Sequence, residues 1–182
     1  HFLGRGSDRA LDDEHALRIA VKAIGNEIRK FPSGMPATGN STSGYDDTRN
    51  GLPHNAVDIA GNEGSDIVAR HSGVVSDQGI LNCAGKTLTL DDGTKVSCKD
   101  GGAVYIQITS KPVGTEDTKF VTQYLHLQKD SAIDVGTEVQ PGDTIGRMGN
   151  TGFSTGSHLH YEIIVEDEQE RVYLDPSDFL GN

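Results

Sequence analysis

Two histidines stand close together near the end of the chain, in the segment GNTGFSTGSHLHYEI from Gly149 to Ile163. Side chains alternate between the faces of an extended strand, so His158 and His160 are expected on one face, roughly 6.6 Å apart along the backbone. Imidazole is the commonest protein ligand for zinc, and a zinc site needs at least three protein ligands. The pair therefore directs attention to ligand-forming residues elsewhere in the chain.

A second candidate group lies far upstream, in GLPHNAVDIAG, where His54 and Asp58 stand four residues apart. A straight strand would hold the two side chains about 13 Å apart, which is too far for a shared ion with bonds of roughly 2.0–2.2 Å. The run between Gly51, Pro53 and Gly61 is too short for a helix. We therefore expect an irregular loop that bends into a strand and brings the two side chains together.

A third candidate is His126, which lies in the β-rich run FVTQYLHLQ. Strict alternation along a strand places His126 on the same face as Tyr124. This segment supplies a fourth imidazole to the candidate set.

Taken in order, the three motifs resemble those of the lysostaphin-type (LytM-type) zinc metallopeptidases, endopeptidases that cut bacterial cell-wall peptides. The resemblance runs from Pro53 to Leu180 and departs from the usual pattern at Ala56, where relatives carry glycine. The motifs that carry it are His54-x-x-x-Asp58, then Tyr124-Leu-His126-Leu, and Gly152-x-Ser-Thr-Gly-x-His158-Leu-His160-x-Glu-Ile.

The resemblance implies a role for each of five residues. His54, Asp58 and His160 are the expected ligands of one zinc ion per chain. His126 and His158 are expected to stay unligated and to handle proton transfer and the oxyanion, and which of the two is the base is left open. A tyrosine that supports the oxyanion in relatives has one candidate here, Tyr45.

The function implied is zinc-dependent hydrolysis of peptide bonds in peptidoglycan, in its stem or cross-bridge peptides. The alternative is a non-catalytic member of the same fold that binds the wall or regulates another hydrolase. Such members typically lose metal ligands, whereas all five positions are present here. The expected location is outside the cytoplasm: secreted, periplasmic, cell-wall or membrane-anchored through a part outside this sequence, or delivered by a phage.

The elements around these motifs predict a mainly β domain. Short strands separated by turn residues recur after residue 66: IVAR, GVVSDQ, TLTLDDGTKVS, AVYIQI, FVTQYLHL and HYEIIVE. They favour a largely antiparallel sheet, and the resemblance implies a peptidase domain of the duplicated-hybrid-motif type. The turns in VGTEVQPGDTIGRMG also resemble biotinyl and lipoyl carrier domains, but no lysine sits in the turn that such a carrier would modify.

The first part of the chain differs in pattern. Residues 7–31 predict a capped helix with an apolar stripe, which would pack against the β domain, a fused domain or a partner. Residues 32–51 are rich in Gly, Ser, Thr, Asn and Asp and predict a loop. We therefore divide the chain into a helix and loop, 1–50, and a peptidase domain, 51–182. His15, within the helix, is not a candidate for function.

Charge and hydropathy exclude several classes of protein. A net charge of −11 argues against binding nucleic acid through its phosphates. No run of eighteen apolar residues is present, so no membrane span is expected. The sequence also contains no signal peptide, so the protein either has none or carries it outside these residues.

The cysteines, Cys83 and Cys98, flank a predicted hairpin whose turn is Asp92-Gly93. A two-residue turn would put Cys98 opposite Thr87, so a disulfide requires the chain to fold back before the hairpin. We expect that disulfide, because the stretch resembles an insertion that needs a covalent link in an exported protein. A further histidine, His71, is predicted to be exposed or structural.

Overall fold

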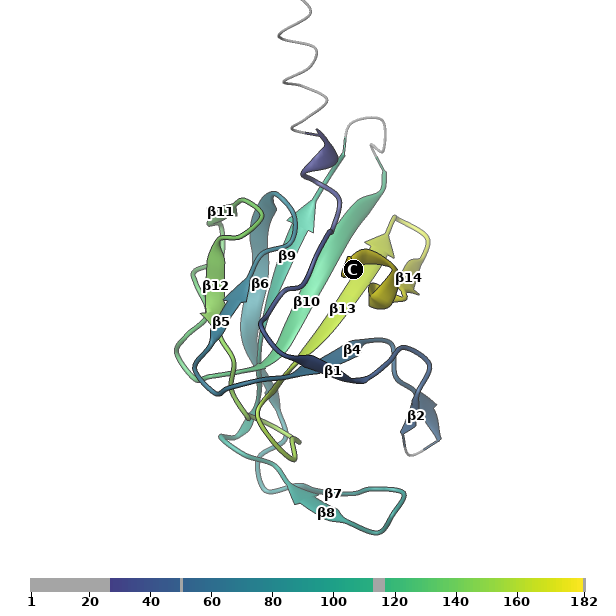
Figure 1. The fold of residues 1–182 in the computed structure, drawn as a ribbon, viewed down its shortest axis with the longest axis vertical. Coiled ribbons are helices and arrows are strands. Elements are labelled where there is room, and N and C mark those ends of the chain that lie inside the picture. Colours follow the sequence, from purple (N-terminus) through teal and green to yellow (C-terminus); the bar gives the residue numbers. More distant parts are fainter. Residues whose placement is uncertain (1–26, 50, 113–116, 182) are drawn as a thin grey trace, which may run out of the picture.

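The structure, a computed structural model, describes residues 27–49, 51–112 and 117–181. Within these residues the main feature is an eight-stranded antiparallel sheet in the order β1-β4-β13-β10-β9-β6-β11, with β14 also pairing with β13 (Figure 1). The predicted mainly antiparallel β fold is confirmed. The elements are β1 (Asn40–Ser43), β2 (Thr48–Arg49), β3 (Leu52–Pro53), β4 (Val57–Ala60), β5 (Asp66–Val68), β6 (Gly73–Asn82), β7 (Thr87–Thr89), β8 (Lys95–Ser97), β9 (Gly102–Ser110), β10 (Lys119–Leu127), β11 (Glu138–Val139), β12 (Thr144–Arg147), β13 (His158–Glu166), β14 (Arg171–Leu174) and the 3-10 helix η1 (Pro176–Phe179).

The hydrophobic core lies on one face of this sheet. Alternate residues of β9, β10 and β13 point into it, including the fully buried Tyr124 and Tyr161. A two-stranded ribbon of β5 and β12 contributes Ile67 and Ile145 to the same core. Because β-strand side chains alternate, the other face of β13 carries His158 and His160. One face of the strand therefore anchors it in the core while the other presents the site.

Of the helix predicted for residues 7–31, only residues 27–31 fall within the described part of the chain. There the Lys30 amide donates to the Glu27 carbonyl at 3.0 Å and the Phe31 amide to the Ile28 carbonyl at 3.2 Å, which forms a short turn. The Phe31 ring packs edge-on against Phe120 of β10, with centroids 5.2 Å apart. This contact joins the turn to the sheet.

The segment predicted as loop, residues 32–51, contains strands β1 and β2. Strand β1 pairs with β4 at the edge of the main sheet, with Asn40 opposite Ala60 and Ser41 opposite Ile59. Its sequence, NSTS, is polar throughout and mostly exposed, so no apolar alternation marks it as a strand. The loop prediction was wrong here because β1 is held by backbone pairing rather than by buried side chains.

No helix within the described part of the chain is long and apolar enough to cross a bilayer.

Candidate metal centre

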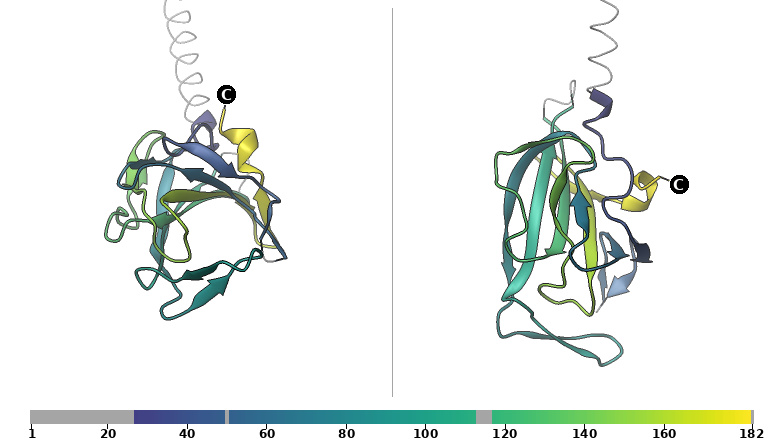
Figure 2. Two further views of the ribbon diagram at one scale, coloured as in Figure 1. Left: turned by 60° about the horizontal axis from the view of Figure 1, so that its bottom comes forward. Right: turned by 60° about the vertical axis from the view of Figure 1, so that its left-hand side comes forward.

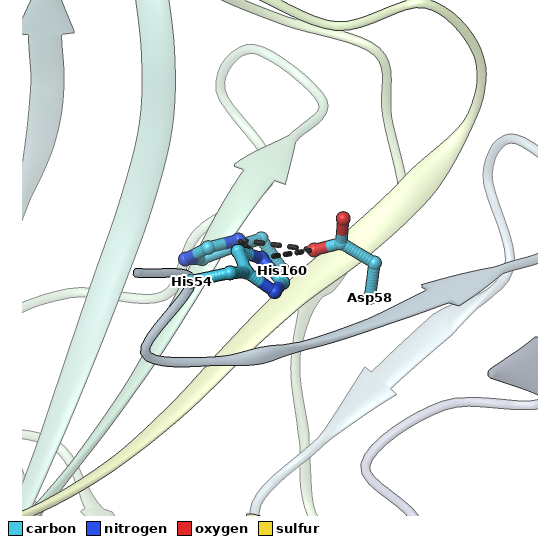
Figure 3. Close-up of side chains that lie close together, drawn as sticks. All are labelled: His54, Asp58 and His160. Atoms are coloured by element: carbon cyan, nitrogen blue, oxygen red, sulfur yellow. Dashed lines mark hydrogen bonds and ion pairs between the residues drawn. The ribbon is translucent and has the colours of Figure 1, made fainter. Parts of the chain in front are cut away.

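Three of the predicted residues lie close together where β4 pairs with β13. His160 lies directly opposite Asp58 in the antiparallel register of the two strands. His54 precedes β4 and follows β3, and the chain bends at Ala56 between His54 and Asp58. The three side chains point toward one another (Figure 3). The bend expected from their spacing is therefore present, and it brings two residues of one segment to a single histidine of another.

The distances between the three sets of ligand atoms suit a single small ion. His54 Nε2 lies 3.2 Å from His160 Nδ1 and 3.3 Å from Asp58 Oδ1, and His160 Nδ1 lies 3.0 Å from Asp58 Oδ1. A tetrahedral ion with bonds of about 2.0–2.2 Å holds its ligand atoms roughly 3.3–3.6 Å apart. Two imidazoles and one carboxylate, set within a few tenths of an ångström of that spacing, are a donor set that zinc accepts with a fourth position open.

Partners on the outer ring nitrogens fix which nitrogen faces the centre. His54 Nδ1 lies 2.8 Å from the Gly44 carbonyl, and His160 Nε2 lies 3.1 Å from Glu162 Oε1. Each of these oxygens accepts a hydrogen bond, so the proton of each neutral ring sits on the outer nitrogen. The lone pairs of His54 Nε2 and His160 Nδ1 then point inward. Such outer partners are the usual means by which proteins orient metal-binding imidazoles.

The charge around His160 favours a cation. Burial lowers the pKa of His160, but hydrogen bonds to Asp58 and Glu162 outweigh it and raise the pKa to about 9. A proton on Nδ1 and a metal ion compete for the same position, because both would lie between Nδ1 and the Asp58 carboxylate.

His126 reaches the site by a route that strand alternation does not predict. Leu125 and Leu127 pair with Tyr105 and Val104, which are adjacent on β9, so His126 is the extra residue of a β-bulge. Its backbone has φ of +66°, an uncommon value for a residue other than glycine. The expectation that His126 shares a face with Tyr124 was therefore wrong. The bulge turns the imidazole away from the core and toward the histidines of β13.

His126 and His158 form a second pair of rings beside the three-residue set. Their ring centroids are 4.5 Å apart, and His126 lies 6.0 Å from His160 by the same measure. His126 Nδ1 is 2.7 Å from the Thr151 carbonyl, and His158 Nδ1 is 2.9 Å from the Gly156 carbonyl. These carbonyls hold the proton of each neutral ring on Nδ1, which leaves Nε2 as the basic nitrogen.

The surroundings of His126 favour its neutral ring. Burial is the main cause that lowers the pKa of His126 to about 4, and the neighbouring His158 adds to the effect.

The bulge at His126 packs closely against Gly149, because a Cβ at position 149 would lie 2.5 Å from the Gln128 amide nitrogen. Only glycine lets the loop before β13 approach the bulge so closely.

Glu162 also belongs to the site, although the sequence motifs predicted no role for it. It lies two residues after His160 on the same face of β13, so the alternation that paired His158 with His160 could have found it. Its second oxygen accepts a hydrogen bond of 2.9 Å from the Gln123 amide, and Gln123 in turn bonds to Gln107 on β9. The carboxylate is therefore held in place from the neighbouring strand.

Tyr45 has a different partner in this structure. Its hydroxyl donates to the Tyr173 carbonyl on β14 at 3.1 Å. This bond fixes the loop before β2 against the edge strand. Support of an oxyanion by Tyr45 stays a prediction, and this contact does not favour it.

The hairpin between β6 and β9 carries the cysteine pair. Cys83 and Cys98 are joined in a disulfide, and the chain folds back at Gly85 as that link requires. The predicted register was wrong by one residue: Thr87 lies opposite Ser97. The cause is a three-residue turn, 91–93, that ends in Gly93 with φ of +83°.

His71 is buried rather than exposed. Its Nε2 lies 2.8 Å from Thr122 Oγ1 on β10, on the core side of the sheet. Burial lowers its pKa to about 4. Of the two alternatives, the structural one holds.

Comparisons with known proteins agree with this arrangement. Residues 97–176 match Peptidase family M23. Lysostaphin of Staphylococcus simulans is 30% identical over 131 residues, which cover 72% of this chain and 22% of lysostaphin. Peptidoglycan DD-endopeptidase ShyC of Vibrio cholerae is 41% identical over 66 residues, which cover 36% of this chain and 13% of the relative.

The fold gives the same result. The catalytic domain of lysostaphin from Staphylococcus simulans superposes with a TM-score of 0.54 at 25% identity, over 78% of this chain and 92% of that domain. Among curated relatives, the chain spans only 13% to 24% of the length of three that it matches. The chain belongs to the lysostaphin/LytM-type metallopeptidases, peptidase family M23.

Proposed function

We propose that the chain is a zinc-dependent endopeptidase that hydrolyses peptide bonds in bacterial peptidoglycan, with residues 51–182 as the peptidase domain. Membership of family M23 supports cell-wall peptidase activity in general. The observation that carries the finer proposal is the pairing of a three-donor set with two imidazoles anchored at Nδ1. A set of ligands alone would suit a structural ion. The Nε2 atoms of His126 and His158, beside the open fourth position of the ion, suit hydrolysis instead.

In this proposal His54, Asp58 and His160 hold the ion. When bound, zinc supplies Lewis-acid polarisation of the scissile carbonyl and acidification of the attacking water. Glu162 and the Gly44 carbonyl keep the inner nitrogens deprotonated and aimed at the centre.

The remaining two histidines handle protons. With Nδ1 fixed on backbone carbonyls, the Nε2 atoms of His126 and His158 can take a proton from the attacking water and donate one to the leaving amine or to the oxyanion. Their rings face each other, so the two functions can be divided between neighbouring groups. The expected place of action is the cell wall, outside the cytoplasm.

The decisive experiment is digestion of purified peptidoglycan by the zinc-loaded protein, with mass spectrometry of the released muropeptides. New amino and carboxyl termini at a defined peptide bond are expected, and a chelator or Asp58→Ala should abolish them. Intact peptides from several wall types, in the presence of bound zinc, would refute the proposal. Sedimentation of the protein with those intact walls would then support the non-catalytic alternative.

A further inference from the structure

The hairpin of β7 and β8 has one apolar and one polar face. Leu88 pairs with Val96, and the Leu90 amide bonds to the Thr94 carbonyl, so these side chains share a face. Val96 is buried and the two leucines are half-buried. Alternate residues of the same strands, such as Thr89, are exposed on the other face.

The apolar face lines a cavity of about 650 Å³ that contains the candidate catalytic residues. Leu88, Leu90 and Val96 line it from the hairpin, and Thr42 and Ser43 line it from β1. His126 and His158 line the same cavity. Its volume falls within the range typical of binding pockets, about 300–1,000 Å³. In the ribbon, the hairpin of β7 and β8 extends from one end of the main sheet (Figure 2).

The base of the hairpin is fixed to the site. The disulfide closes it, and the Cys98 amide donates to the Lys86 carbonyl at 2.9 Å. Lys99 and Gly152 exchange two backbone hydrogen bonds of 3.0 Å each. Gly152 belongs to the loop that leads into His158, so the hairpin and the second histidine pair share one support.

We propose that this hairpin is a specificity-determining wall of the substrate groove, and that Leu88 and Leu90 favour peptides with a methyl-bearing residue, such as alanine, beside the scissile bond over glycine-only peptides. The inference rests on the proposed endopeptidase function and names its substrate class. Three apolar side chains face a space that also holds the reactive imidazoles, so a substrate in that space contacts them. A glycine chain offers them no side chain to bury.

The expected size of the preference follows from the hydrophobic effect. Burial of one methyl-sized group corresponds to about a fourfold gain in kcat/KM when the contact persists in the transition state. At low substrate concentration, a peptide with one alanine beside the scissile bond should therefore be cleaved about 4 times faster than the all-glycine peptide. A second alanine that contacts the leucines should increase the rate further.

The test compares the zinc-loaded protein on amidated pentaglycine and on a set in which each internal glycine is replaced in turn by L- or D-alanine. The wild-type protein should favour at least one alanyl peptide. Leu88→Ser and Leu90→Ser should each bring the ratio of alanyl to glycyl kcat/KM close to one, with zinc content kept. Leu90→Met, which retains an apolar side chain, should keep the ratio close to the wild-type value.

Thr89→Ala is the matched control, because Thr89 lies on the same strand with its side chain on the opposite face. It should leave the ratio at the wild-type value. Cleavage of glycyl and alanyl peptides at equal rates by the wild-type protein, or an unchanged ratio in both leucine variants, would overturn the inference and leave the peptidase proposal standing. Failure to cleave any of these peptides or peptidoglycan would overturn both.

Discussion

The site contains two histidine pairs that differ in what holds them, and we propose that this difference separates metal binding from proton transfer. His54 and His160 meet a carboxylate, Asp58, on their inner nitrogens. His126 and His158 are held by backbone carbonyls. The carboxylates raise the pKa of His160 to about 9, whereas burial lowers that of His126 to about 4. Carboxylates beside His160 thus favour a positive charge at its ring, whereas burial keeps the His126 ring neutral.

The largest expected effect comes from breaking the ligand set. His160→Ala and Asp58→Ala each leave two ligands, so zinc should be lost together with activity. Elemental analysis after gel filtration, alongside peptidoglycan digestion, measures both. Full zinc occupancy in Asp58→Ala would show that Asp58 is not a ligand.

Removal of the second pair should separate metal content from turnover. His158→Ala and His126→Ala should keep zinc and lose activity by about two to four orders of magnitude, the scale of a missing acid, base or oxyanion donor. The same two measurements apply. If His158→Ala lost zinc while His160→Ala kept it, the roles of the two histidines of β13 would be exchanged; parental activity in His126→Ala would remove that residue from the mechanism.

A smaller effect tests the carboxylate behind the ligand set. Glu162→Gln keeps an oxygen for His160 Nε2 but removes the charge, so zinc affinity should fall about 10–100-fold. Competition with a chromogenic chelator gives the affinity without reference to activity. Glu166→Gln is the control, because Glu166 lies on the same strand and face, where it pairs with Lys119 at 3.1 Å. Equal affinities in the two variants would deny Glu162 a positioning role.

Much of the candidate metal centre was predictable from local sequence rules. Alternation placed His158 and His160 on one face, and the short distance required by zinc predicted the bend between His54 and Asp58. The register that sets His160 opposite Asp58 was not predictable in this way, because the two strands are far apart in sequence. The likeness to a known family supplied that pairing.

The failures have specific physical causes. The bulge at His126 needs a positive φ at a residue other than glycine, and the packing of Gly149 that stabilises it comes from another part of the chain. The hairpin register depended on whether its turn had two or three residues, and Asp91-Asp92-Gly93 fits either count. Strand β1 lacks an apolar pattern altogether. In each case a long-range or backbone contact decided the outcome.

For His71 the sequence left two alternatives, exposed or structural, because the residues around it gave no sign that Thr122 of β10 would lie against it. His71 is a third buried histidine, hydrogen-bonded to Thr122 and not to a carboxylate, and burial lowers its pKa to about 4, as it does for His126. The unfolded chain, with an ordinary histidine pKa near 6.5, binds a proton more readily than the folded one. Stability from this residue is therefore complete above about pH 6.5 and is lost as the pH falls toward 4. Between pH 7 and pH 5 the loss should be about 2 kcal/mol.

The measurement is urea unfolding of zinc-free protein at pH 7 and pH 5, for the wild type and for His71→Gln. Gln lacks a titrating group, so the variant should lose about 2 kcal/mol less than the wild type over this interval, whatever its stability at pH 7. The difference between the two proteins cancels the contribution of His160 and other groups, which titrate in both. A wild type and variant with the same pH dependence would mean that His71 is not buried as a neutral imidazole. Burial without a carboxylate would then not suffice to keep a histidine neutral in this fold, and the contrast drawn between the two pairs would lose its physical basis.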